Sequence, residues 1–122
     1  MVDIAFALSA TALSSDDNFR KMKSLLDEII NSYSPSATRY SIITFGKIPV
    51  VELDFGGVSD LMELRETLQQ ITKNQQGADL AKTLRNTRQL FQTAAVSRPN
   101  AEKILVVAMD KVSDSEIGRA HV

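Results

Sequence analysis

The feature that most constrains this sequence is a short, nearly continuous apolar run at its start, from Val2 to Leu8. A strand with one wet face alternates apolar and polar residues, whereas a strand covered on both faces is apolar throughout. A second run of this kind, Ile104 to Met109, ends at Asp110. The two runs therefore predict buried strands of a mostly parallel sheet, joined by the long stretch of chain between them.

That intervening chain alternates between helical and strand periods. Apolar residues recur at helical spacing in three stretches, which are residues 18–33, 59–73 and 79–96. A second strand is expected over residues 40–45, and a third around Val51, Leu53 and Phe55, which alternate with two acidic residues. Its close return and the nearby Pro49 suit an antiparallel edge strand.

This order of elements predicts an α/β fold of the Rossmann-like, doubly wound class. The sheet is expected to be mostly parallel, with one antiparallel edge strand and helices on both faces. The length of 122 residues corresponds to one ordinary domain, so a single domain over residues 1–122 is expected. Ser113 and Glu116 have the spacing of a capping box close to Val122, from which we expect the domain to continue beyond this sequence.

Composition excludes several classes of function. The 14 basic and 15 acidic residues give a net charge of −1 and form no block that would follow a nucleic acid backbone. No apolar run approaches the ~20 residues that a membrane-spanning helix needs, so this segment is not expected to insert into a membrane. The absence of cysteine excludes disulfides and thiolate metal sites.

Catalytic motifs are also missing. The only histidine is His121, no Ser-His-Asp set can be assembled, and no glycine-rich phosphate loop follows the first strand. We therefore expect no enzymatic activity and no cofactor.

Several ordered segments resemble the von Willebrand factor type A (vWA) domain. Five segments of this chain are similar to elements of that family. Residues 3–8 resemble its first strand, 18–23 its first helix, 39–45 its second strand, 77–84 its glycine-threonine loop with the following helix, and 98–107 the approach to its fourth strand. The resemblance implies a doubly wound sheet of which this chain supplies the first four strands, the C-terminal strands being absent.

The resemblance also implies a place for a ligand. In open α/β sheets ligands bind beyond the carboxyl ends of the parallel strands, here at residues 9–15, 75–79 and 110–113. Many family members hold a metal ion there, in a metal-ion-dependent adhesion site. The matching positions in this sequence are Ser9, Thr11, Leu13, Ala78 and Asp110.

Only Asp110 keeps the family's residue, and Thr11 keeps a hydroxyl. Magnesium relies on carboxylate oxygens to offset its dehydration, so this degenerate site is expected to bind metal weakly or not at all. Asp79 has two open interpretations: a second carboxylate near Asp110, or an N-cap of the following helix. Asp110 can likewise serve a ligand or accept hydrogen bonds from nearby backbone amides.

The resemblance implies a non-enzymatic module for protein–protein interaction and adhesion, working without metal. We expect a protein ligand, a matrix component being one candidate, bound around Ser9, Thr11, Asp79 and Asp110. The family suggests an extracellular location, either secreted into the matrix or on a cell surface. The alternative is a purely structural spacer or assembly module in a multidomain protein. Neither the partner nor the oligomeric state can be read from the sequence.

Overall fold

The computed structural model describes residues 2–12, 14–33, 37–55, 60–73, 75–77 and 79–109, with the backbone alone for 94–97. The secondary structure elements in chain order are β1 (Val2–Ser9), α1 (Asp16–Ser32), β2 (Thr38–Phe45), β3 (Pro49–Leu53), α2 (Leu61–Gln70), α3 (Leu80–Ser97) and β4 (Glu102–Ala108). The order predicted from the sequence is confirmed. Asp110 and the expected C-terminal helix lie outside the described residues.

The described strands form one sheet in the order β3-β2-β1-β4. β1 pairs in parallel with β2, from Val2 opposite Thr38 to Ser9 opposite Phe45, and it also pairs in parallel with β4. β3 returns antiparallel to β2. The mostly parallel sheet with one antiparallel edge strand is therefore as predicted. The prediction that a single domain covers residues 1–122 and continues beyond them is not tested by these strands.

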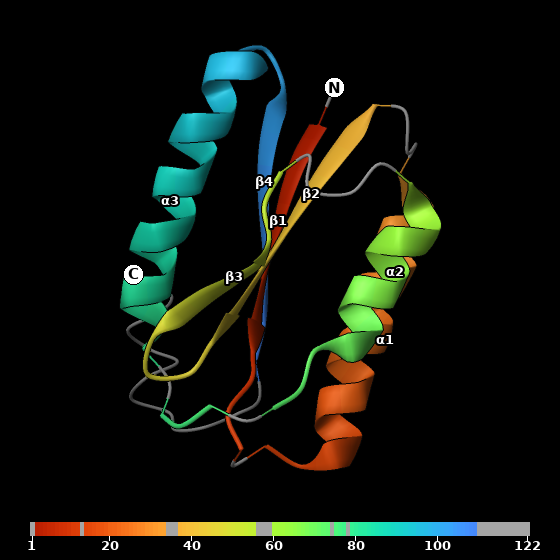
Figure 1. The fold of residues 1–122 in the computed structure, drawn as a ribbon, viewed down its shortest axis with the longest axis vertical. Helices are drawn as coiled ribbons and strands as arrows, with labels where there is room; N and C mark the ends of the chain where they lie inside the picture. Colours follow the sequence, from red (N-terminus) through yellow and green to blue (C-terminus); the bar gives the residue numbers. More distant parts are fainter. Residues whose placement is uncertain are drawn as a thin grey trace.

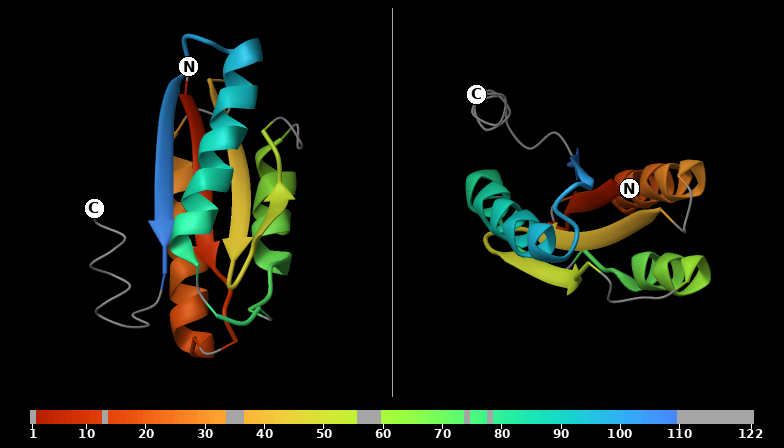
Figure 2. Two further views of the ribbon diagram at one scale, coloured as in Figure 1. Left: turned by 90° about the vertical axis from the view of Figure 1, so that its left-hand side faces the viewer. Right: turned by 90° about the horizontal axis from the view of Figure 1, so that it is seen from above.

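Helices cover both faces of the sheet (Figure 1). α1 and α2 lie on one face and α3 on the other, which the view along the strands shows most clearly (Figure 2). None of the described helices is long and apolar enough to cross a bilayer.

The main hydrophobic core lies between the sheet and the α1–α2 layer. Alternate residues of β1, namely Ile4, Phe6 and Leu8, are fully buried there and pack with residues of both helices. On the other face β1 presents Ala5 and Ala7, whose small side chains allow α3 to approach closely. Continuous apolar sequence in β1 is thus explained by burial on two different surfaces.

Side-chain caps set where the helices begin. The Ser15 side chain accepts a hydrogen bond from Asn18 N at 3.1 Å and caps α1. Asp60 caps α2 by accepting from Glu63 N at 2.8 Å. Each cap satisfies a backbone donor that has no partner within its helix.

The predicted alternation of buried and exposed residues in the third strand is wrong for Val51. The sequence pattern places Val51 and Leu53 on one buried face, but Leu53 is 7% exposed and Val51 43% exposed. The register of β3 against β2 shifts between Ile42 and Ile43, so Val51 pairs with Ile43 and Leu53 with Ile42. An irregularity of this kind places two residues of one strand opposite one of its neighbour and turns the following side chain to the other face.

Candidate functional site

Three connections meet beyond the carboxyl ends of β1 and β2, at the lower end of Figure 1. We call residues 10–12, 46–48, 75–77 and 79 the loop surface. Gln75 N donates to Ala10 O at 3.0 Å, and Ala12 N donates to Gln75 O at 2.7 Å. These bonds accompany an isolated parallel bridge between Thr11 and Gln75. The connection before α3 is therefore fixed to the connection after β1.

The turn after β2 is joined to the same connection. Asp79 N donates to Gly46 O at 2.7 Å, and Lys47 N donates to Gln76 O at 2.5 Å. A Cβ at Gly46 would lie 2.6 Å from Gln75 Cβ and 2.7 Å from Gln76 O, closer than real Cβ contacts. This close approach requires a glycine at position 46.

Ser9 ends β1 directly beneath the loop surface. The residue is fully buried, and its hydroxyl oxygen has no hydrogen-bond partner within the part of the chain that the structure describes. Thr11, two residues further on, is 2% exposed. Both predicted site residues are thus at the expected end of the sheet, but their side chains lie below the surface that a partner protein would touch.

Asp79 immediately precedes α3 and is partly exposed. Its Oδ1 accepts a hydrogen bond from Lys82 N at 2.9 Å, and its backbone oxygen accepts from Thr83 Oγ1 at 2.9 Å. These are the contacts of an N-cap, which is one of the two interpretations that the sequence left open. Leu13, Ala78 and Asp110 lie outside the described residues.

The donor atoms of this site suit a hard divalent cation poorly. Ser9 and Thr11 offer neutral hydroxyl oxygens, and the Asp79 carboxylate already accepts from a backbone N–H. Within the described ranges, no group of three or more His, Cys, Asp or Glu side chains could hold a metal ion. Cations such as Mg²⁺ need near-ideal octahedral oxygen shells with carboxylate support, which these described residues do not provide.

At the opposite end of the sheet lies a charged cluster that the sequence reasoning missed. Asp3 is fully buried and accepts two hydrogen bonds of 3.0 Å from Arg39 and one of 2.9 Å from Lys103. Arg98 Nη1 lies 3.4 Å from Asp3 Oδ1. A carboxylate inside an apolar strand was the signal that could have revealed this cluster, since buried charges are paired.

Burial of the Asp3 carboxylate raises its pKa, but the hydrogen bonds and charges of Arg39 and Lys103 outweigh burial. The net result is a pKa below the usual value of an aspartate. The cluster joins β1, β2 and β4.

A twisted, mostly parallel sheet with helices on both faces and a loop surface beyond its strand ends defines an α/β domain of the doubly wound, Rossmann-like class. The sequence profile of the von Willebrand factor type A domain matches residues 3–121. The chain therefore belongs to the vWA domain family.

Solved structures share this fold. Proximal thread matrix protein 1 from the mussel byssus superposes with a TM-score of 0.72 at 18% identity, over 87% of this chain and 27% of that protein. Another structure of the same protein, with the same TM-score and identity and 28% of that chain covered, has a zinc-occupied MIDAS (metal-ion-dependent adhesion site) motif. An aerotolerance-related membrane protein from Bacteroides fragilis superposes with a TM-score of 0.65 at 17% identity, over 88% of this chain and 53% of that protein.

This chain thus spans from about a quarter to about half of the length of these proteins. At such identities the likeness establishes the fold alone.

Proposed function

We propose that this chain is a non-enzymatic, protein-binding vWA module that contacts its partner through the loop surface, with Ser9, Thr11, Asp79 and Asp110 as the site residues. The family commonly mediates protein–protein interaction. Ser9 and Thr11 act from beneath by shaping the connection after β1, while Asp79 reaches solvent in part.

The observation that carries this proposal is the set of four backbone hydrogen bonds joining the three connections of the loop surface. A surface that is already ordered loses little conformational entropy when a partner binds, so more of the contact energy appears as affinity.

Metal independence is part of the proposal. It is supported by the neutral oxygens at Ser9 and Thr11 and by the capping role of the Asp79 carboxylate. Recognition then depends on shape and polar contacts, without a cation that bridges to a carboxylate of the partner. The mussel protein with zinc in its motif illustrates the other arrangement.

A location in the extracellular matrix or at a cell surface is also proposed. It is supported by the family and by the byssal matrix protein among the structural neighbours, although a bacterial membrane-related protein is another neighbour.

The experiment uses solid-phase binding of the chain to purified matrix proteins, namely fibrillar collagen, laminin and fibronectin, in EDTA and in Mg²⁺. We expect binding to at least one of them that is equal in the two buffers. Asp79→Asn keeps an oxygen that can accept from Lys82 N but removes the charge, and it should weaken binding without a change in melting temperature.

Asp60→Asn is the matched control, because Asp60 caps α2 at the opposite end of the sheet (Figure 1). Failure to bind any of the matrix proteins would reject the proposal that the partner is a matrix component. Equal effects of the two substitutions would reject the proposal that the loop surface is the binding site. A purely structural module is the second candidate, favoured by the burial of Ser9 and Thr11 and by the capping role of Asp79.

A further inference from the structure

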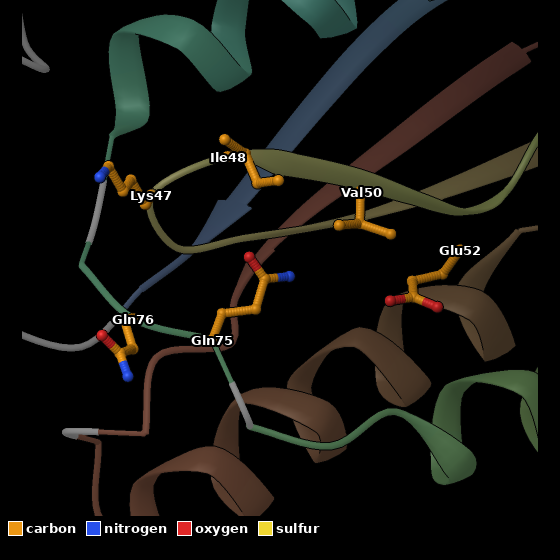
Figure 3. A pocket seen from close by; sticks show the side chains of 6 residues that line it. All are labelled: Lys47, Ile48, Val50, Glu52, Gln75 and Gln76. Carbon is orange, nitrogen blue, oxygen red and sulfur yellow. The ribbon is translucent and has the colours of Figure 1, made fainter.

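Overlapping one side of the loop surface, a groove of about 520 Å³ runs between β3 and the connection before α3. It is lined by Lys47, Ile48, Val50, Glu52, Gln75 and Gln76, and we call it the hairpin groove (Figure 3). It is an open groove on the surface and not an enclosed cavity. Sequence reasoning did not find it, because its walls are separated by more than 20 residues.

One wall of the hairpin groove is apolar and exposed. Ile48 is 54% exposed and Val50 is 38% exposed. Both lie along the same hairpin and are labelled in Figure 3. Adjacent exposed aliphatic side chains in a groove favour contact with an apolar side chain of another molecule.

Two polar side chains of the groove, Gln75 on the opposite wall and Glu52 on β3, are held in place. Gln75 Nε2 donates to Thr44 Oγ1 at 3.0 Å, and Thr44 Oγ1 donates to Glu52 Oε1 at 2.8 Å. This chain of bonds fixes the Gln75 and Glu52 side chains before any ligand arrives. A pre-organised polar group provides orientation at little entropic cost.

Charges of opposite sign mark the two ends of the hairpin groove. Lys47 and Glu52 lie at opposite ends of the set of side chains in Figure 3, with Val50 and Gln75 between them. Among the described residues, the Lys47 ammonium forms no ion pair or hydrogen bond. An ammonium at one end of an apolar groove can pair with a carboxylate of another molecule.

We propose that the hairpin groove binds an extended segment of a partner protein that carries a carboxylate side chain, an aliphatic side chain and a basic side chain in that spatial order. The carboxylate meets Lys47, the aliphatic side chain packs on Ile48 and Val50, and the basic side chain meets Glu52. The proposal rests on the proposed function, since the hairpin groove shares four residues with the loop surface and the proposal names the chemistry of the partner that this surface contacts. Complementary charges at two ends of an apolar contact select for sequence and orientation more than for affinity.

The probes for the test are two capped hexapeptides, acetyl-Gly-Asp-Ile-Val-Lys-Gly-amide and its counterpart with Asp and Lys exchanged, because the groove does not fix the direction of the chain. A peptide with Asn and Gln in place of the charged residues is the control. Titration of the isotope-labelled full chain should shift the NMR amide signals of the hairpin groove with at least one charged peptide. The neutral peptide should bind about fivefold more weakly, as expected from the loss of exposed ion pairs.

Variants of the chain complete the design. Lys47→Glu should weaken binding of the charged peptide about fivefold, and a peptide with Lys in place of its Asp should recover that loss. Arg88→Glu makes the same charge change on α3, on the other face of the sheet, and should have no effect. Glu52→Gln keeps a side-chain oxygen that can accept from Thr44 Oγ1, and it removes the charge at the end of the hairpin groove opposite Lys47. Ile48→Ser should weaken binding about tenfold through lost apolar contact.

Absence of shifts in the hairpin groove, no effect of Lys47→Glu, or equal effects of Lys47→Glu and Arg88→Glu would each overturn the proposal. The proposed function is judged separately by Asp79→Asn on matrix proteins. If the peptides do not bind the hairpin groove while Asp79→Asn still weakens matrix binding, only this inference is rejected. If the peptides bind the groove but Asp79→Asn does not change matrix binding, the predicted site around Asp79 is rejected and the hairpin groove remains supported as a peptide-binding site.

Discussion

Asp3 and Lys103, 100 residues apart in sequence, are joined by a hydrogen-bonded ion pair of 2.9 Å between the carboxylate of β1 and the ammonium of β4. Arg39 of β2 binds the same carboxylate through two hydrogen bonds. One buried acid thus connects three neighbouring strands at the end of the sheet opposite the loop surface.

Asp3→Asn should strongly destabilise the domain at neutral pH. The amide removes the charge that compensates three surrounding cations, and loss of one partner of a buried ion pair costs about 3–5 kcal/mol. Urea unfolding at pH 7 measures this change. Asp16→Asn is the control, because Asp16 is 95% exposed in its pair with Lys73 and should contribute little. Similar losses for the two variants would contradict the role given to Asp3.

The same cluster predicts a pH dependence. The pKa of Asp3 is lower in the folded state than in the unfolded state, so the folded state releases this proton more readily. The resulting stabilisation is complete above the unfolded pKa of about 4 and is lost as pH falls through the lower, folded pKa. Unfolding free energy measured between pH 7 and pH 2 should fall less steeply in Asp3→Asn than in the parent chain. An equal fall of the unfolding free energy with pH in both chains would show that other carboxylates determine the loss of stability in acid.

Much of the fold could be predicted because local signals and tertiary burial agree. The apolar run of β1 is buried on both faces, and Ser15 and Asp60 cap the helices that periodicity predicts. A fold can be predicted from its sequence when local conformational preferences and tertiary packing agree in this way.

What could not be predicted depends on pairing between distant segments. The exposure of Val51 follows from a register shift, and the contact between Gly46 and Gln75 follows from how two connections pack. The sequence predicts that Ser9 and Thr11 take part in binding a protein ligand. It does not predict their burial, or the bridge that joins Thr11 to Gln75. None of these relations has a signature within one short stretch of sequence.

Gly46→Ala should disturb the loop surface. The added Cβ meets Gln75 Cβ at 2.6 Å and backbone at Gln76 O at 2.7 Å, so the connection must move, at a cost of about 1–3 kcal/mol. Gly77→Ala is the comparison: its Cβ would have ordinary contacts, but its φ of 70° is unfavourable for alanine. Gly77→Asn should recover part of the loss, because asparagine tolerates this backbone region, whereas Gly46→Asn should not. Thermal unfolding of the four variants checks this order, and equal recovery at both positions would contradict the steric argument for Gly46.

Two buried serines provide a test with opposite signs. Among the described residues the Ser9 hydroxyl has no hydrogen-bond partner, so Ser9→Ala removes a polar group unsatisfied by them and should stabilise the domain by up to about 1 kcal/mol. Ser41 is equally buried, but its hydroxyl donates to Leu53 O at 2.8 Å. Ser41→Ala should therefore destabilise the domain by about 1 kcal/mol. Chemical denaturation of the pair measures both changes, and destabilisation by Ser9→Ala would indicate that its hydroxyl has a partner in solution.

Divalent cations should not stabilise the folded chain. A ligand that binds only the folded state raises the melting temperature, and millimolar Mg²⁺ or Mn²⁺ should leave it unchanged because Ser9 and Thr11 offer neutral oxygens. Ser9→Asp is the matched variant, since it places a carboxylate at a fully buried position at the end of β1. This variant should be destabilised without metal and should recover in part with Mn²⁺, as measured by thermal unfolding with and without EDTA. A clear shift of the parent chain with either ion, abolished by Asp110→Asn, would instead establish a working metal site and end the metal-independent proposal.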